Sequence, residues 1–140
     1  MELFVEYHNL KKEYDEAKNN YENKLEEKAK LFFDTQPKAV RPKEIVNHIS
    51  ITSDKYLEYC EKIEVVDIEV ENARNLLGVR EYRLKLKEME LKESNEILDI
   101  IFTKRFIKKM KVKHIARDLI YSYQRIYQLL DEINEKIRKN

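Results

Sequence analysis

The sequence predicts an all-α protein: long amphipathic, coiled-coil-like helices in the N-terminal part, followed by a pair of helices joined by a tight turn near the C-terminus. The 140 residues include one glycine and two prolines, far too few for the many turns of a sheet protein. Charged residues make up 39% of the chain, against roughly 25% in average domains. Hydrophobic residues, at 42%, recur at heptad spacing, which indicates packed helices and excludes a disordered polyelectrolyte.

The first predicted element is one long amphipathic helix over residues 1–33. Its apolar positions follow the 4–3 spacing of a heptad seam: Leu3, Tyr7, Leu10, Tyr14, Ala17 and Tyr21. After Tyr21 we expect the seam to shift toward Leu25, Ala29 and Phe32, as in a straighter helix. Because tyrosine and alanine make a weak zipper, packing against another helix of the same chain is favoured, and pairing between subunits stays open.

Residues 34–52 are predicted to be a linker. Pro37 ends the first helix, because the residue before a proline is displaced from the α region, and Pro42 reinforces the interruption. One short helix, Lys43–His48, is expected inside the linker. Ser53 is a suitable N-cap for the helix that follows.

Residues 53–93 are predicted to form a helical body. Its first helix repeats the heptad spacing at Tyr56, Tyr59, Ile63, Val66, Val70, Ala73 and Leu77. We expect a break or kink at Gly78, the only glycine. A further helix over Arg80–Lys92 would present one broad apolar face with Leu84, Leu86, Met89 and Leu91. The next helix is expected to begin at Ser94 and Asn95.

The charge is distributed unevenly, although the net charge of the chain is only +1. Residues 101–140 contain eleven basic and four acidic residues, a net charge of +7. The first hundred residues contain seventeen basic and twenty-three acidic residues, a net charge of −6. A basic module joined to an acidic body suggests that the basic part has a polyanion as its partner.

Residues 94–140 are predicted to be a helix-turn-helix DNA-binding module. Where the two helices of such a motif cross, the backbones approach closely and require a small residue, for which Ala116 is suited. Ile115 and Leu119 would anchor the first helix, and Ser122 would cap the second. Ile126, ten residues after Ala116, occupies the position of the second helix's main core residue.

The second helix, Ser122–Lys136, would then read the major groove. Glutamine can pair with adenine, and arginine with guanine or phosphate. The predicted DNA contacts on this helix are Ser122, Tyr123, Gln124, Arg125, Tyr127 and Gln128. The predicted phosphate contacts that precede it are Lys108, Lys109, Lys111, Lys113 and Arg117. The competing interpretation is an ordinary helical hairpin whose tyrosines and glutamines are merely solvated.

A family resemblance rests on the segment Lys113–Leu119, followed by Tyr121-Ser122 and Ile126-Tyr127. It resembles the helix-turn-helix of the fourth conserved region of bacterial sigma factors, and more closely the phage and prophage transcriptional regulators of the ArpU and RinA type. The resemblance covers about Lys111–Leu130. It implies a role at a promoter, with the second helix in the major groove. One departure is Ile120, which occupies the turn position usually held by glycine, and a β-branched residue is unfavourable at positive φ.

Other chemistry has little support in the sequence. Cys60 is the only cysteine and is expected to be a small buried hydrophobe, so we predict no disulfide and no cysteine-based metal site. His8, His48 and His114 have no partners at metal-ligand spacing. No phosphate loop, nucleophile elbow or HExxH motif is present, so we predict neither cofactor nor catalytic residues, and no enzyme activity. No membrane segment or export signal is expected, which indicates a cytoplasmic protein of a bacterial host.

The leading hypothesis is a sequence-specific transcriptional regulator of phage or prophage origin that binds double-stranded DNA. Its acidic helical part would form a homodimer or contact RNA polymerase, because a single small module makes too few contacts for tight specific binding. The alternative is a coiled-coil protein–protein interaction module, an adaptor or inhibitor, that does not bind DNA. That alternative explains the heptads equally well and treats the C-terminal charge as a contribution to solubility.

Overall fold

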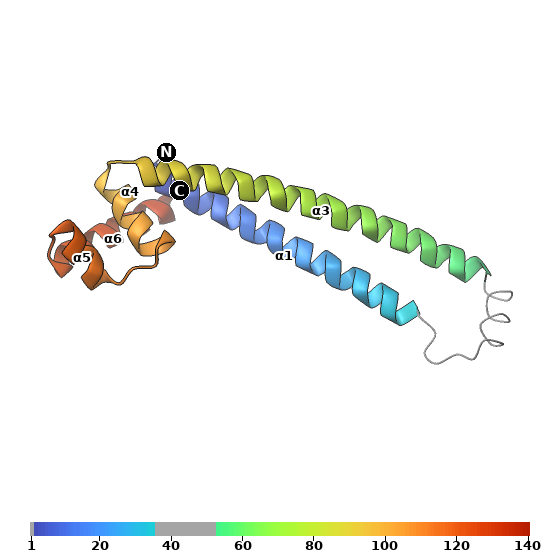
Figure 1. Cartoon of the computed structure of the whole chain (residues 1–140). Coiled ribbons are helices and arrows are strands. Elements are labelled where there is room, and N and C mark those ends of the chain that lie inside the picture. The colour runs from blue at the N-terminus through green and yellow to red at the C-terminus, as the bar shows by residue number, and fades with distance from the viewer. Residues whose placement is uncertain (1, 36–52) are drawn as a thin grey trace. The chain divides into compact units, whose positions relative to one another are not determined.

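The computed structural model describes residues 2–35 and 53–140, and these ranges contain helices and no strand (Figure 1). The all-α fold class is therefore confirmed. In chain order the elements are α1 (Leu3–Thr35), α3 (Ser53–Glu93), α4 (Ile97–Phe102), the π-helix η1 (Thr103–Ile107), α5 (Val112–Leu119) and α6 (Tyr123–Lys139). α1 extends two residues beyond the predicted end at Phe33. The expected short helix Lys43–His48 and most of the predicted linker lie outside the described residues.

The predicted break at Gly78 is wrong, because α3 runs through this residue as one helix of 41 residues (Figure 1). Gly78 is exposed, and a Cβ atom added to it would meet no atom of the described residues within 4 Å. Glycine inside a helix costs about 1 kcal/mol relative to alanine. That cost is small beside the hydrogen bonds and the apolar seams on either side, so the helix continues.

The next helix begins later than predicted, at Ile97 and not at Ser94. Glu96 is the N-cap and makes no capping hydrogen bond with its side chain. The hydroxyl of Ser94 instead donates to Oδ2 of the buried Asp99 at 2.6 Å and accepts from the Glu96 N–H at 3.3 Å. α4 then passes into η1, where the N–H of Lys108 donates to the carbonyl of Thr103 at 2.9 Å.

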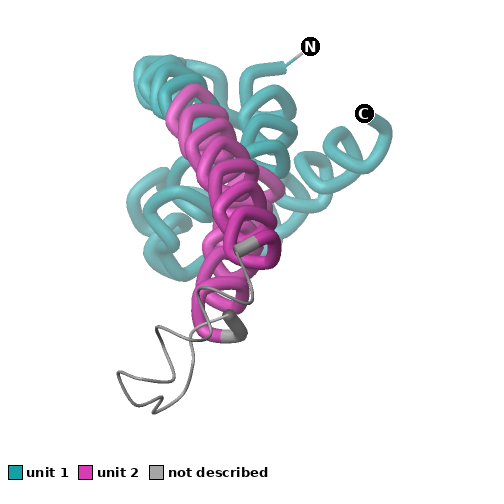
Figure 2. The backbone as a smooth tube through the Cα atoms, turned by 90° about the vertical axis from the view of Figure 1, so that its right-hand side faces the viewer, with its two compact units in different colours: residues 1–14, 80–140 teal, residues 15–79 magenta. Residues whose placement is uncertain are grey.

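The chain divides into two compact units, shown in teal and magenta in Figure 2. We call residues 1–14 and 80–140 the head, and residues 15–79 the hairpin. Each unit contains a stretch of α1 and a stretch of α3, and the head also contains all of the later helices.

The hydrophobic core of the head joins elements from both ends of the chain. Its buried members are Phe4, Val5, Leu91, Ile101, Phe102, Val112, Ile115, Ala116, Ile126, Leu129, Leu130 and Ile133. Phe102 lies at the centre of a ring cluster, with ring centroids 5.8 Å from Phe4, 5.7 Å from Tyr7 and 4.9 Å from Phe106. Full burial of a large apolar side chain contributes about 1.5–3 kcal/mol. The start of α1 therefore belongs to the same folding unit as α5 and α6.

Ion pairs accompany this apolar packing at the start of α1. Nζ of Lys136 in α6 lies 2.6 Å from Oε1 of Glu2, and Nζ of Lys87 in α3 lies 2.7 Å from Oε2 of Glu6. Hydrogen bonds to these carboxylates are the main cause that raises the pKa of each lysine above its ordinary value. The ion pairs confirm that this part of the N-terminal helix packs within the chain.

The hairpin is much less apolar inside than the head. Ala17 and Ala73 are the only buried apolar side chains among its described residues. Nζ of Lys24 lies 3.0 Å from Oε2 of Glu69, and Nζ of Lys28 lies 2.6 Å from Oδ1 of Asp67. Here small side chains and charged pairs, and not large apolar groups, connect α1 with α3.

The predicted seam shift after Tyr21 is also wrong. Leu25 and Phe32 are exposed, at 40% and 44% of their surface, whereas Lys24 and Lys28 are partly buried. The heptad spacing therefore continues through two lysines. A lysine can cover apolar surface with its aliphatic stem while its ammonium group pairs with a carboxylate, and this is why hydrophobicity alone misplaced the seam.

The predicted seam of α3 is confirmed in most of its length and corrected at its first position. The seam residues from Tyr59 to Leu77 are buried or partly buried, but Tyr56 is exposed at 59%. In the second half of the helix, the apolar residues lie on two different faces, and not on the single face that was expected. Leu84 and Leu91 are buried, whereas Leu86 and Met89 are exposed.

Candidate nucleic-acid interface

The helix pair α5–α6 is held together by the residues that the sequence pattern singled out. Ala116 is 3% exposed, and Ile115 and Ile126 are fully buried in the head core. Leu119 is partly buried and packs against the same core. The small side chain of Ala116 in this packed position fits a close approach of the two helices, so both helices have fixed positions in the head.

The turn between the helices uses a left-handed residue, as the usual glycine would. Ile120 has φ 57° and ψ 44°, and its side chain is 90% exposed. The N–H groups of Ile120 and Tyr121 both donate to the carbonyl of Ala116, the latter at 3.0 Å, which closes the end of α5. The departure at this position therefore leaves the turn geometry intact, and the β-branched side chain is strained by about 1–2 kcal/mol.

The predicted N-cap of the second helix is confirmed. The hydroxyl of Ser122 accepts a hydrogen bond from the N–H of Arg125 at 3.2 Å. This bond satisfies one of the N–H groups that the first turn of a helix leaves without an internal partner. The cap fixes the residue at which α6 begins, and with it the direction of every side chain in the first two turns.

From Tyr123 to Gln128, at the start of α6, every side chain is exposed except that of Ile126, which is buried. Tyr123 and Tyr127 are 58% and 57% exposed, although large aromatic side chains usually find a place in a core. The other exposed members of the set are Gln124, Arg125 and Gln128. This surface combines hydrogen-bond donors and acceptors, one positive charge and two aromatic rings.

Basic side chains precede this surface on α5 and in the loop between η1 and α5. Lys108, Lys109, Lys111, Lys113 and Arg117 are all exposed. Within the described part of the chain, none of these five forms an ion pair, whereas the neighbouring Lys104 lies 3.4 Å from Oδ2 of Asp118. Five uncompensated positive charges close together in the sequence would attract an anionic ligand.

The loop that carries three of these lysines has a defined conformation. Lys109 adopts a left-handed conformation, with φ 56°. The guanidinium of Arg105 donates to the carbonyl of Met110 at 2.9 Å, and the N–H of Met110 donates to the carbonyl of Lys104, also at 2.9 Å. The lysines thus project from a fixed backbone.

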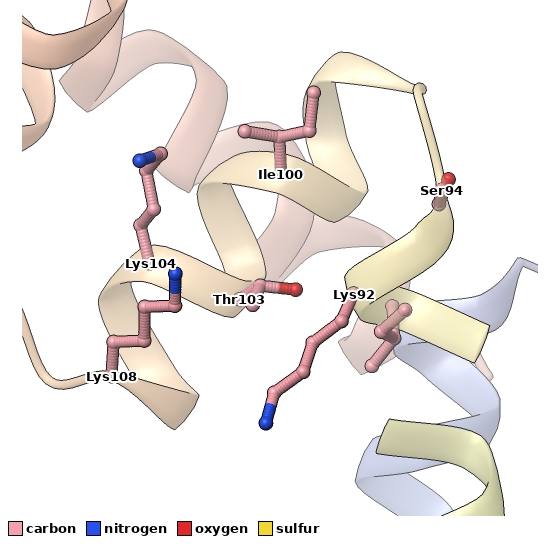
Figure 3. A pocket seen from close by; sticks show the side chains of 7 residues that line it. Lys92, Ser94, Ile100, Thr103, Lys104 and Lys108 are labelled. Carbon is pink, nitrogen blue, oxygen red and sulfur yellow. The ribbon is translucent and has the colours of Figure 1, made fainter. Parts of the chain in front are cut away.

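A cavity of about 270 Å³ lies beside this loop (Figure 3). Lys104 and Lys108 border one side, and Lys92, from the last turn of α3, borders the other (Figure 3). Thr103 also lines the cavity, and its buried hydroxyl oxygen has no hydrogen-bond partner among the residues that the structure describes. Sequence reasoning did not include Lys92 or Lys104 in the site, because Lys92 belongs to a different helix and nothing in its local pattern indicates where that helix ends in space.

Other titratable groups form no second site in the described residues. No three histidine, cysteine, aspartate or glutamate side chains there come together as a metal site. Burial, followed by the charge of Lys12, lowers the pKa of His8. A hydrogen bond with Cys60 raises the pKa of Tyr56, and Cys60 itself is only partly buried. Among the described residues, no helix is long and apolar enough to cross a membrane.

Comparisons with protein-family models, with curated proteins and with solved structures find no match to this chain. The function of the chain is therefore inferred from the geometry of the site and from the sequence pattern.

Proposed function

We propose that the protein binds double-stranded DNA with α5 and α6 acting as a helix-turn-helix, and that it regulates transcription. The observation that carries the proposal is the exposed surface of α6 from Tyr123 to Gln128, which starts at a capped N-terminus over a buried core. In helix-turn-helix proteins, the N-terminal residues of the second helix contact base edges in the major groove. Gln124, Arg125 and Gln128 have the side-chain chemistry for such contacts.

Phosphate contacts are assigned to the exposed basic residues that precede α6. Lys113 and Arg117 are four residues apart on α5 and therefore lie on one face of that helix. Lys108, Lys109 and Lys111 extend this positive surface through the fixed loop. Such contacts orient a protein on the duplex without reading its sequence.

The resemblance to phage and prophage regulators of the ArpU and RinA type supports a role at a promoter. In this proposal the protein acts in the cytoplasm of a bacterial host, and contact with RNA polymerase would involve the acidic remainder of the chain. No enzymatic step is part of the proposal.

The test is binding of the full chain to random and native upstream DNA across a salt series. The logarithm of the affinity should fall by about 0.9 per neutralised phosphate for each unit of log salt. The double variant Gln124→Ala, Arg125→Ala should lose the preference for one fragment by about tenfold or more, since each bidentate base contact contributes about 1–3 kcal/mol. Lys113→Ala should weaken binding to all fragments and reduce the salt slope by about one contact.

The matched control is Lys18→Ala, Asn19→Ala, which removes a similar charge and amide from exposed positions of α1. It should leave DNA binding unchanged. Absence of salt-dependent binding at low salt and micromolar protein would overturn the proposal and favour the alternative of a protein–protein interaction module.

A further inference from the structure

α3 carries two apolar stripes, and the described residues cover only one of them. The inner stripe is buried or partly buried and consists of Val66, Val70, Ala73, Leu77, Leu84 and Leu91. The outer stripe is exposed, each side chain by 44–64%, and consists of Val65, Ile68, Val79, Tyr82, Leu86 and Met89. Exposed apolar side chains that gather along one side of a helix can mark a site of protein–protein interaction.

The outer stripe has the spacing of a coiled-coil seam. Its members fall at alternating intervals of three and four residues from Val65 to Met89 once the exposed Asn72 and Asn75 fill the two middle positions. α3 is a single uninterrupted helix over this range (Figure 1). With 3.6 residues per turn, the inner and outer stripes lie on nearly opposite sides of the helix, so a partner on the outer stripe would not compete with α1.

We propose that two copies of the chain pair through the outer stripes of their α3 helices in an antiparallel coiled coil. In the register that matches the two stripes, Val65 faces the partner's Met89 and Ile68 faces the partner's Leu86. Asn72 then faces the partner's Tyr82, and Asn75 faces the partner's Val79. The polar asparagines gather near the two-fold axis, and the apolar layers lie toward both ends.

The charges that flank the stripe select the antiparallel direction. In this register Glu71 lies opposite the partner's Lys85, and Glu69 opposite the partner's Arg83. The pairs farther out, Glu64 with the partner's Lys92 and Lys62 with the partner's Glu90, are also of opposite sign. In a parallel pair, Glu64 would instead lie against the partner's Glu69, and of these flanking charges only Lys85 would meet an opposite charge, the partner's Glu90. Complementary flanking charges set partner choice and orientation in coiled coils.

Four of these flanking residues already form ion pairs within the chain: Glu69 with Lys24, Lys85 with Glu81, Glu90 with Lys87 and Lys92 with Glu88. Three of these four pairs join residues three or four apart on α3, at the exposed surface, where an ion pair contributes about 0.2–1 kcal/mol. They can be shared with, or exchanged for, the pairs between subunits at little cost.

Gly78 supports the same arrangement. In the part of the chain that the structure describes, nothing requires a glycine there, since an added Cβ atom would meet no atom within 4 Å. In the antiparallel register Gly78 faces the partner's Gly78 beside the two-fold axis, where the missing side chain lets the two helices approach closely. The pairing thus assigns a role to the residue of α3 that has the lowest helix propensity.

The first test is the mass of the full chain in solution, measured by sedimentation equilibrium from about 1 to 100 μM. A dimer is expected for the unchanged chain, because a stripe of this length resembles a short two-stranded coiled coil. Ile68→Asp should produce a monomer of unchanged helical content. The matched control Leu25→Asp, at an exposed apolar residue of α1, should remain dimeric. A monomer at all concentrations for the unchanged chain would overturn the proposal.

The second test separates the antiparallel pair from a parallel one. Glu71→Lys or Lys85→Glu alone creates two like-charge pairs by symmetry and should raise the dimer dissociation constant on the order of tenfold. The two changes together restore opposite charges and should restore the affinity. In a parallel pair, Lys85→Glu would face the partner's Glu90, so failure of the double variant to recover would overturn the antiparallel register. Neither test depends on DNA, so this inference and the proposed function can fail independently.

Discussion

The head and the hairpin share the helices α1 and α3, but they bury different kinds of side chain. Among the described residues, thirteen buried apolar side chains lie in the head and two, both alanines, lie in the hairpin. The head therefore contains a core of its own, and the hairpin depends on helix propensity, partly covered seams and ion pairs. Several large apolar side chains of the hairpin are instead exposed. A unit with a large apolar core and a unit whose described buried apolar side chains are both alanines thus share one pair of helices.

The largest expected difference between the two regions is the cost of removing a phenyl ring. Phe102→Ala in the head should lower the free energy of unfolding by about 3–5 kcal/mol, because it leaves a cavity among Phe4, Tyr7 and Phe106. Phe33→Ala in the hairpin removes the same ring from a position that is 67% exposed, and should change stability by about 0.5 kcal/mol or less. Urea unfolding of both variants measures the difference, and equal losses would contradict the division into a packed head and an open hairpin.

Sequence reasoning succeeded where a local rule determines the structure. A serine before a helix accepts from the N–H three residues later, so Ser122 could be identified as a cap. Ala116 and Ile126 followed from the spacing that two crossing helices require. The exposed face of α6 followed from the same spacing, since fixing the buried side of a short helix also fixes its outer side.

The failures have one physical origin, which is that periodicity identifies an apolar face without showing what covers it. Leu86 and Met89 were grouped with Leu84 and Leu91, although the two pairs lie on different faces. Lys24 continues a seam that hydrophobicity alone would end. Gly78 looked like a helix end because glycine is common there, but the many residues that extend the helix on both sides outweigh its low propensity.

A smaller effect in the opposite direction is expected at the turn of the head. Ile120→Gly should raise the free energy of unfolding by about 0.5–1 kcal/mol, because glycine adopts φ near 57° without the steric cost that a β-branched side chain carries. The gain is less than the full strain because glycine also loses more entropy on folding. The control is Ile120→Val, which keeps the branch and should leave stability nearly unchanged. A loss of stability in the glycine variant would mean that Ile120 makes a contact that its 90% exposure does not show.

The smallest expected effects are those of the ion pairs, and they show whether the two regions differ in electrostatics as well as in packing. Lys87 in the head pairs with Glu6, and Lys24 in the hairpin pairs with Glu69. Hydrogen bonds to these carboxylates are the main cause that raises the pKa of each lysine above 10.5. A raised pKa in the folded state means that the stabilisation is complete below pH 10.5 and is lost as the pH rises through the folded value.

Lys87→Met should therefore lower the free energy of unfolding by about 0.5–1 kcal/mol at pH 7, and the difference from the unchanged chain should close above pH 10.5. Lys24→Met should show the same trend with a smaller amplitude, because its side chain is 27% exposed against 19% for Lys87. A cost for Lys87→Met that persists at high pH would assign its role to packing of the aliphatic stem, and not to charge.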